Sequence, residues 1–260
     1  MHYFIDSGTV MNRIPTLSAI IIAKNEGKRL EECIKNLLWA DEVIVVDNGS
    51  TDNTRAIGQR YKAIVISERM HNFSRLRNIG ARNAHGHWLL YVDADETITS
   101  ALRQEIVKII SDPKALSAYV IPRKNWYLGE PWPFQDGMIR LIQKDAFVTW
   151  EGVLHEHAIV RGQIGTVVNS FIHNTHRSLT EMVEKTNEWS SYEATLRLNA
   201  HHPTISWWRI LRVMNSSFLD SFIGQGGWRA GGLGWTESMY QSFSIFITYA
   251  KLWEMQNKKA

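Results

Sequence analysis

The sequence predicts an α/β fold in which a doubly wound, mostly parallel sheet is followed by a smaller mixed-sheet half and a C-terminal helical extension. From Leu17 onward, short apolar runs alternate with helix-like segments, which is the pattern of parallel strands joined by crossover helices. After about Ser117 the strand-like runs become shorter and less regular, and from Ser178 the chain is helix-like.

The first half of the chain contains four strand-like runs and three helix-like segments. We place the strands at 17–23, 42–47, 63–66 and 88–93, and the helices at about 28–38, 52–61 and 74–84. In a sheet of this kind, ligands bind beyond the carboxyl ends of the strands. The residues that follow each strand are therefore the first candidates for a binding site.

The second half is less regular. Strands are expected at 118–122 and 138–143, separated by a loop rich in Trp and Pro. The helical part is interrupted by Pro203, and we interpret its glycine-rich stretch 224–234 as a flexible connection because it does not follow a strand. This organisation divides the chain into an N-terminal tail (1–16), a main domain (17–175) and a C-terminal helical extension (176–260).

Composition narrows the class of protein. The 29 Lys and Arg residues nearly balance the 26 Asp and Glu residues, so we expect no nucleic-acid partner. The single cysteine, Cys33, lies in a helix-like stretch and fits a packing role in a reducing compartment. Residues 1–13 lack the features of a signal peptide, and the best apolar run, 238–250, is too short to span a bilayer. We expect a cytoplasmic protein, with the inner face of the cell membrane as a peripheral location.

Three polar clusters follow the predicted strands and should converge on one edge of the sheet. The first strand ends in Ala23-Lys24-Asn25-Glu26, the second in Asp47-Asn48-Gly49-Ser50-Thr51-Asp52, and the fourth in Asp93-Ala94-Asp95. Carboxylate oxygens two residues apart suit Mg²⁺ or Mn²⁺, which complete their coordination with substrate phosphates and water. Such an ion would neutralise charge on a diphosphate leaving group. Taken alone, the aspartate pair also fits a solvated turn.

The second cluster adds a nucleotide to this interpretation. Asp47 ends a buried strand at the switch point of the sheet, where its carboxylate would accept a hydrogen bond from a base or a ribose. Ser50 and Asp52 also fit the start of the next helix, and for these two residues we favour helix capping.

Together, these three motifs and the segment 77–86 resemble glycosyltransferase family 2, with ordered spacing from about Leu17 to Val160. The resemblance implies a GT-A fold, an inverting mechanism, a divalent metal (Mn²⁺ or Mg²⁺) and a nucleoside-diphosphate sugar, commonly linked to UDP. It makes 17–175 the catalytic domain. One departure is Asn48, where many members carry a second acidic residue, and this leaves the identity of the nucleotide open.

The resemblance also implies roles for individual residues. It places Asp47 on the base, Arg77 near the nucleotide, Asp93 near the ribose and Asp95 on the metal. The remaining motif positions, which we assign to the nucleotide-sugar site by their place in the motifs, are Ala23, Asn25, Glu26 and Ala94.

Inverting transfer requires a base for the attacking hydroxyl, and the candidates are Glu151, His155, Glu156 and His157. The segments Trp126-Tyr127-Leu128-Gly129, Arg140-Leu141 and Val153-Leu154-His155-Glu156 resemble a subgroup of lipopolysaccharide-core and related cell-envelope glycosyltransferases. By that resemblance Glu156 is the base. His155 either contacts the metal or the diphosphate, or has a structural role beside a strand.

The C-terminal extension carries an apolar helical face together with Arg209 and Arg212. Two interpretations stay open: a packed core or subunit contact, and a Trp-rich amphipathic surface at a membrane. A lipid-linked or glycan acceptor, as the subgroup implies, favours the membrane. The residues of the stripe are Trp207, Leu211, Met214, Phe218 and Phe222.

Two other functions are consistent with the same residues. A nucleotidyltransferase would need a glycine-rich basic loop after the first strand, where this chain has the acidic segment 24–28. A catalytically inactive, membrane-associated nucleotide-binding scaffold would not need the intact carboxylates. The sequence therefore favours a glycosyltransferase over both.

Overall fold

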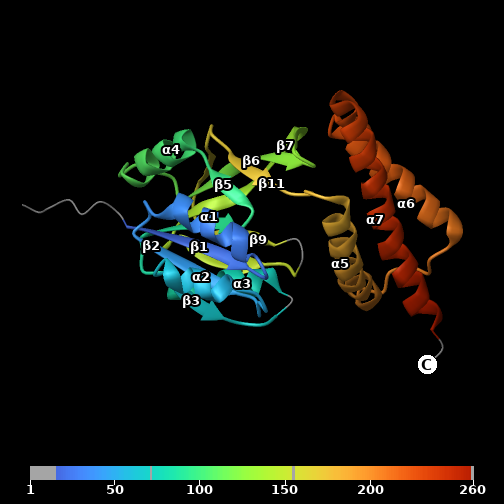
Figure 1. Cartoon of the computed structure of the whole chain (residues 1–260), viewed down its shortest axis with the longest axis horizontal. Coiled ribbons are helices and arrows are strands. Elements are labelled where there is room, and N and C mark those ends of the chain that lie inside the picture. The colour runs from blue at the N-terminus through green and yellow to red at the C-terminus, as the bar shows by residue number, and fades with distance from the viewer. Residues whose placement is uncertain (1–15, 71, 154–155, 259–260) are drawn as a thin grey trace, which may run out of the picture.

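The computed structural model describes residues 16–70, 72–153 and 156–258. It confirms the predicted fold class: a large, mostly parallel sheet with a mixed part, followed by a helical extension (Figure 1). The strands of the main sheet run in the order β3-β2-β1-β4-β7-β6-β11-β5, and β10 pairs with β6. Their bounds are β1 Leu17–Ala23, β2 Glu42–Asp47, β3 Ile64–Ser67, β4 Trp88–Asp93, β5 Glu96–Ile98, β6 Ala118–Tyr127, β7 Glu130–Gln143, β10 Ile164–Thr166 and β11 Phe171–Asn174.

The four parallel strands β1 to β4 are the part that the sequence predicts best. Their apolar residues alternate between the two faces: Ala19 and Ile21 of β1 belong to one core cluster, and Ile20 and Ile22 to the other. The first cluster packs against α1, α2 and α4, and Cys33 lies in it, as expected. The second packs against α3 and the separate hairpin β8–β9. These elements are α1 Gly27–Leu37, α2 Thr54–Arg60, α3 Phe73–Asn83, α4 Ser100–Ile110, β8 Phe147–Glu151 and β9 His157–Val160.

The prediction of a loop between residues 122 and 138 is wrong. Strands β6 and β7 continue through it as one long hairpin that turns at Leu128 and Gly129, both with positive φ. Strand-forming alternation is weak here and two prolines interrupt it, so local patterns indicate a loop. Trp132 is buried in this hairpin and packs its ring 5.0 Å from that of Tyr127. It therefore has a structural role and does not present a free face to a ligand.

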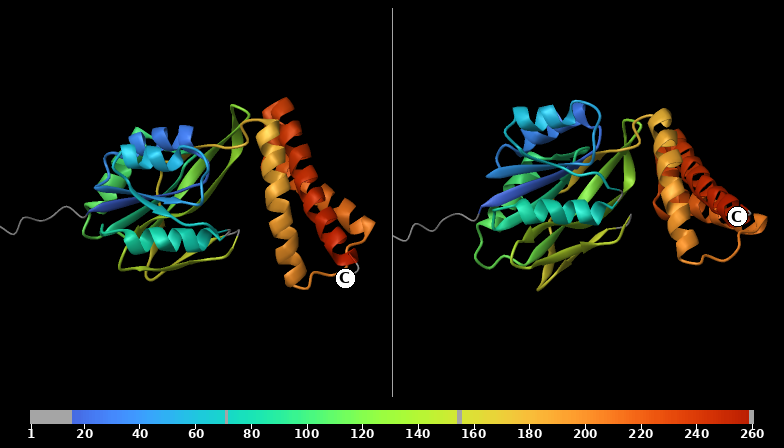
Figure 2. Two further views of the ribbon diagram at one scale, coloured as in Figure 1. Left: turned by 60° about the horizontal axis from the view of Figure 1, so that its bottom comes forward. Right: turned by 90° about the horizontal axis from the view of Figure 1, so that it is seen from below.

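The C-terminal extension is a three-helix bundle that lies beside the α/β part (Figure 2). Helix α5 (Leu179–Asn199) begins at Ser178, whose hydroxyl accepts a hydrogen bond from the backbone N–H of Glu181. Helices α6 (Trp207–Leu219) and α7 (Gly231–Asn257) follow, linked by the short helical turns η1 (Asp220–Gly224) and η2 (Gly227–Ala230). No helix in the described ranges is long and apolar enough to cross a membrane.

One contact between a histidine and a buried glutamate anchors this bundle to the long hairpin. The Nδ1 of His176 lies 2.9 Å from Oε1 of Glu237, a fully buried residue of α7. The centre of the His176 ring lies 4.7 Å from that of the Tyr127 ring, and the backbone carbonyl of His176 accepts a hydrogen bond from the N–H of Leu128. The connection between β11 and α5 is therefore held by α7 through Glu237 and by the long hairpin through Tyr127 and Leu128.

The glycine-rich stretch is not the flexible connection that we expected. Most of it is helical, and a Cβ added to Gly234 would lie 1.7 Å from the carbonyl oxygen of Gly227. Glycine at 234 thus allows α7 to lie directly against η2. A sequence pattern cannot distinguish this close packing from flexibility, because both require glycine.

Replacing Gly234 by Ala should therefore destabilise the bundle. We expect a loss of about 2 kcal/mol or more, since the new methyl group would collide with backbone that cannot move independently. Gly232→Ala is a matched control in the same helix, because a Cβ there meets no atom within 4 Å. It should be neutral or stabilising by up to about 1 kcal/mol. Thermal unfolding followed by circular dichroism measures both, and equal behaviour of the two variants would contradict the packing role.

Candidate active site

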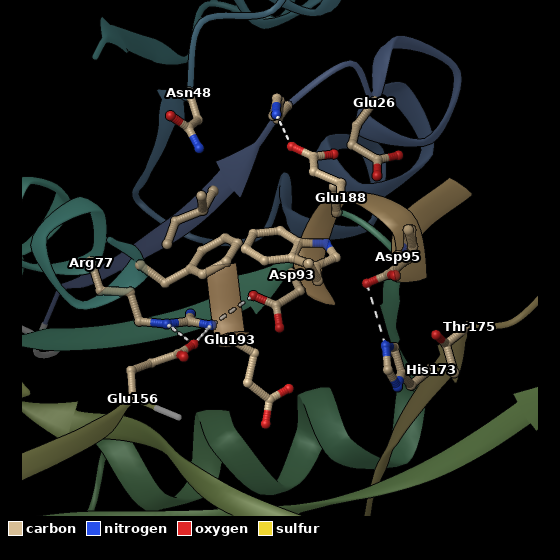
Figure 3. Close-up of a pocket in the computed structure, with 16 residues that line it drawn as sticks. Glu26, Asn48, Arg77, Asp93, Asp95, Glu156, His173, Thr175, Glu188 and Glu193 are labelled. Carbon is tan, nitrogen blue, oxygen red and sulfur yellow. Dashed lines mark hydrogen bonds and ion pairs between the residues drawn. The ribbon is translucent and has the colours of Figure 1, made fainter. Parts of the chain in front are cut away.

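A cavity of about 540 Å³ lies at the carboxyl ends of β1 and β4 and is closed on one side by α5 (Figure 3). Most of the residues predicted for the site line it or lie next to it. Four lining residues come from the C-terminal extension, which the sequence analysis placed outside the catalytic domain. The lining is Ile22, Lys24, Glu26, Asn48, Phe73, Arg77, Asp93, Ala94, Asp95, Glu156, His173, Thr175, Lys185, Glu188, Trp189 and Glu193.

The loops after β1 and β2 are tied together by side chains. Asn25 has a positive φ of 56°, and its Oδ1 accepts a hydrogen bond of 2.8 Å from the N–H of Thr51. The Ser50 hydroxyl accepts from the N–H of Asn25, so Ser50 does not cap the next helix as we expected. Asp52 does contribute to the start of α2, because its Oδ1 accepts a hydrogen bond from the N–H of Thr54. These contacts fix the backbone that carries the first two motifs.

Ala23 and Glu26 lie differently within this loop. Ala23 is buried in the core below the cavity, and its carbonyl accepts a hydrogen bond from the N–H of Asn48. Glu26 lines the cavity, pairs with Arg29, and has a pKa raised by burial. Only Glu26 of the two therefore has its side chain in the cavity.

Asp47 is fully buried beneath the loop and does not line the cavity. Its Oδ1 accepts a hydrogen bond from the N–H of Ser50, and Nε of Arg55 lies 2.9 Å from Oδ2. Oδ2 is thus in an ion pair with Arg55 but accepts no hydrogen bond within the described part of the chain. A buried carboxylate oxygen without a donor is able to accept one from a ligand.

Asp93 lies between two guanidinium groups. Arg77 and Arg140 each contact Oδ1, at 3.0 and 3.2 Å, and Arg140 also contacts Oδ2. Arg140 is fully buried and further contacts the buried Glu96 at 3.1 Å. Burial raises the pKa of the Asp93 carboxyl, but the charges of Arg140 and Arg77 outweigh it and hold the pKa well below 3.8. Asp93 therefore remains ionised and fixed in place.

Arg77 also joins Asp93 to Glu156. Its Nη2 lies 2.9 Å from Oε1 of Glu156 and 3.0 Å from Asp93, and its guanidinium carbon lies 5.0 Å from the centre of the Trp150 ring. Oε2 of Glu156 accepts no hydrogen bond from the residues that the structure describes. One oxygen of the predicted base is thus held, and the other is available on the cavity wall (Figure 3).

Asp95 has a partner that the sequence analysis missed. Oδ1 of Asp95 lies 3.5 Å from Nε2 of His173 in β11, nearly eighty residues further along the chain (Figure 3). Burial raises the pKa of the Asp95 carboxyl, but contact with His173 lowers it below its ordinary value. The predicted metal residue His155 lies outside the described residues.

The orientation of His173 follows from a chain of hydrogen bonds. The amide nitrogen of Asn125 donates to Asp136, so the Asn125 oxygen is the acceptor for Nδ1 of His173 at 2.8 Å. Nδ1 therefore carries a proton, so the protonated imidazole donates from Nε2 to Asp95, whereas the neutral imidazole turns the lone pair of Nε2 toward Asp95. Two lone-pair donors facing each other suit a divalent cation that takes its other ligands from phosphate and water. No group of three metal-binding side chains occurs among the residues described.

The sequence contained one signal for His173: a histidine placed at the end of a short apolar run. It was overlooked because nothing local shows that this run pairs with β6 and β5 beside the aspartate motif. The register of β11 places His173 opposite Asn125 of β6 on one side and opposite Glu96 of β5 on the other. The contribution of α5 to the cavity was missed for the same reason.

The comparisons with known proteins agree with this geometry. The family model of glycosyl transferase family 2 matches residues 18–182, and the chain belongs to that family. It is therefore a glycosyltransferase.

Similar proteins cover nearly the whole chain. The lipopolysaccharide core biosynthesis glycosyltransferase LpsC of Rhizobium meliloti is 24% identical, over 94% of each chain. An uncharacterised glycosyltransferase of Rickettsia prowazekii is 28% identical, over 93% of this chain and 88% of that protein. The mannosyltransferase PcManGT of Pyrobaculum calidifontis, solved with GDP-Man and Mn²⁺, has the same fold. It aligns with a TM-score of 0.51 at 13% identity, over 95% of this chain and 89% of that one.

The charge network makes a prediction about pH. Because the folded pKa of Asp93 lies below the unfolded value of 3.8, its ionised form contributes stability that is lost as the pH falls through the folded pKa. Asp93→Asn should lower the free energy of unfolding by about 2–4 kcal/mol at pH 7, and this difference from wild type should shrink below about pH 4.

Urea unfolding at pH 7 and at several values between pH 4 and pH 3 measures this difference. Asp145→Asn, on an exposed turn, is the control and should have little effect at any pH. A difference between Asp93→Asn and wild type that stays constant down to pH 3 would contradict the proposed ion pairs.

Proposed function

We propose that this chain is an inverting, metal-dependent glycosyltransferase that moves a sugar from a nucleoside-diphosphate donor to a hydroxyl of a glycan or lipid-linked acceptor in cell-envelope polysaccharide synthesis. The observation that carries the proposal is the arrangement of one cavity. Glu156, with one oxygen held by Arg77, and the pair Asp95–His173 lie on walls of the same space. A base and a cation site in one cavity are what inverting transfer requires.

The donor nucleotide is proposed to bind at the loops after β1 and β2. Oδ2 of the buried Asp47, which accepts no hydrogen bond from the described residues, is the proposed acceptor for the base, which would displace Arg55 from it. Asn48 and Glu26 line the cavity beside this loop, and Asn25 and Ala23 hold its backbone in position. We propose UDP as the nucleotide, and GDP is the first alternative because the structural neighbour PcManGT holds GDP-Man.

The diphosphate end of the donor is proposed to lie at the turn after β4. Asp95 and His173 would hold Mn²⁺ or Mg²⁺, which supplies positive charge to a departing diphosphate. Asp93 and Ala94 line the cavity next to them and form the ribose side of the site. Since Asp93 is already bound by two arginines, its contribution to the donor is mainly to hold Arg77 and the turn in place.

Glu156 is proposed as the base that removes the proton from the attacking hydroxyl. Arg77 restrains its carboxylate, so that the free Oε2 is presented to the cavity in a fixed direction. Glu151 and His157, the other candidates that are described, belong to β8 and β9 and do not line the cavity.

Titration calorimetry with UDP and with GDP tests the proposal. Wild type should bind one of them more tightly when Mn²⁺ is present. Asp95→Asn and His173→Ala should each reduce this metal-dependent affinity by about tenfold or more, since two protein ligands hold the ion. Glu156→Gln should bind the nucleotide nearly as wild type does but transfer sugar at least about 100-fold more slowly.

Each outcome bears on a different part of the proposal. Normal Mn²⁺-dependent binding by both metal-site variants would contradict the cation site. Full turnover by Glu156→Gln would contradict the base. Tight nucleotide binding by a wild-type protein that hydrolyses or transfers no sugar, from either donor type, would favour the scaffold alternative.

We further propose that helices α6 and α7 contact an anionic membrane surface, where a lipid-linked acceptor would be found. No residue of α6 is buried, and large apolar side chains on both helices are exposed around a groove of about 440 Å³. Arg209 and Arg212 lie against the ring of Trp208, and α6 contains no acidic residue. Tryptophan beside arginine suits the interface of an anionic bilayer. The groove is lined by Leu211, Met214, Asn215, Phe218, Trp235, Met239 and Ser242.

Sedimentation with vesicles tests this surface. Wild type should bind vesicles that contain phosphatidylglycerol and should bind pure phosphatidylcholine vesicles much less. The double variant Leu211→Ser, Trp235→Ser should lose about tenfold in affinity. Val168→Ser, an exposed apolar residue outside the bundle, is the matched control and should bind as wild type. Binding unchanged in the double variant, or a dimer that the double variant dissociates, would overturn the membrane assignment.

A further inference from the structure

Helix α5 presents two different faces to its surroundings. One face packs into the bundle with its small and apolar side chains, which are Met182, Thr186, Ser190 and Ala194. The face toward the catalytic domain carries larger, mainly charged residues at the same helical spacing. They are Glu181, Lys185, Glu188, Trp189 and Glu193.

Three contacts fix the second face against the loops of the sheet. Glu188 pairs with Lys24 at 2.7 Å, and Glu181 lies 3.6 Å from Arg29. The ring of Trp189 lies 5.3 Å from the ring of Phe73, at the start of α3. Helix α5 is therefore a wall of the cavity in the folded protein, with the turn that carries Lys185 between two anchored turns.

The positive charges on the cavity lining are not equivalent. Lys24 is paired with Glu188, and Arg77 is paired with Asp93 and Glu156. Lys185 is exposed to the cavity and forms no hydrogen bond or ion pair with any of the described residues. It is thus the cation on this lining whose ammonium group is free for a ligand.

The surroundings of Lys185 are strongly acidic. Lys185 lines the same cavity as Glu26 and Asp95, and its positive charge interacts with both carboxylates. Its ammonium group therefore lies near the proposed cation site. The other cations around this space are already paired with its acidic residues, so an entering diphosphate would depend on Lys185 and the metal to offset its charge among six carboxylates. These are Glu26, Asp93, Asp95, Glu156, Glu188 and Glu193.

We propose that Lys185 binds the diphosphate of the donor and stabilises the nucleoside diphosphate as it leaves. This rests on the proposed function. In the transfer, the acceptor oxygen bonds to the anomeric carbon and gives its proton to Glu156, while the bond between that carbon and the diphosphate oxygen breaks. The electron pair stays on the diphosphate, where Lys185 meets the added negative charge. The C-terminal extension then supplies a residue of the donor site.

Calorimetric titration of the full-length protein with Mn²⁺ present separates this role from others. The probes are UDP and GDP, each compared with its monophosphate. Lys185→Met should bind the diphosphate that wild type binds with about tenfold lower affinity, because one contact to a charged group is lost. Its affinity for the monophosphate should fall by less than about threefold, because a single phosphate carries less negative charge for Lys185 to bind. Lys185→Arg keeps the charge and should restore most of the affinity.

Lys108→Met, on the exposed face of α4, removes a lysine far from the cavity lining and should bind as wild type. Unchanged diphosphate affinity in Lys185→Met, or an equal loss for the monophosphate, would overturn the role of Lys185 and leave the donor site itself standing. A wild-type protein that binds neither diphosphate with Mn²⁺ would overturn both the proposed function and the role of Lys185.

Discussion

The buried guanidinium of Arg140 is the contact on which the site depends most. It reaches from β7 to Asp93 at the end of β4 and to Glu96 at the start of β5, and so it holds the turn that presents Asp95. Arg77 extends the same network from α3 to Glu156. Charges this deep in a protein are costly to bury, and they contribute more to fixing geometry than to net stability. The core of the sheet provides most of the stability, and the ion pairs hold the functional carboxylates in position.

Features of this structure that depend on neighbouring residues were predictable from the sequence, and features that depend on residues far apart in the chain were not. Strands β1, β2 and β4 were predicted with their observed ends, because each is a buried apolar run that ends in a polar motif. Arg77, Asp95 and Glu156, which the sequence analysis assigned to the site, line one cavity. The partner of Asp95 was not found, because the register of β11 depends on pairing with strands far away in the sequence. Likewise, the glycines near 230 could not be interpreted until η2 was seen against α7.

The helical extension has two surfaces with opposite chemistry. Helix α5 turns charged residues toward the sheet and forms a wall of the cavity, whereas α6 and α7 expose tryptophan and other apolar side chains. The family model reaches only residue 182, so most of this extension lies beyond the part that defines the family. The similarity to LpsC nevertheless covers 94% of the chain, and so most of the bundle. The bundle is thus largely outside the part that defines the family, yet largely within the similarity to LpsC.

The anchoring of His176 on Glu237 has a mechanical consequence. His173, which faces Asp95, and His176, which holds the bundle, are three residues apart on one strand and its exit. Helix α5 starts directly after them, and its Lys185 faces the same cavity. Pairing with β5 and β6 holds the imidazole of His173 in the sheet beside Asp95, whereas the ammonium group of Lys185 belongs to the bundle that Glu237 secures. A shift of the bundle relative to the sheet would therefore change the distance from Lys185 to Asp95 and leave His173 in place.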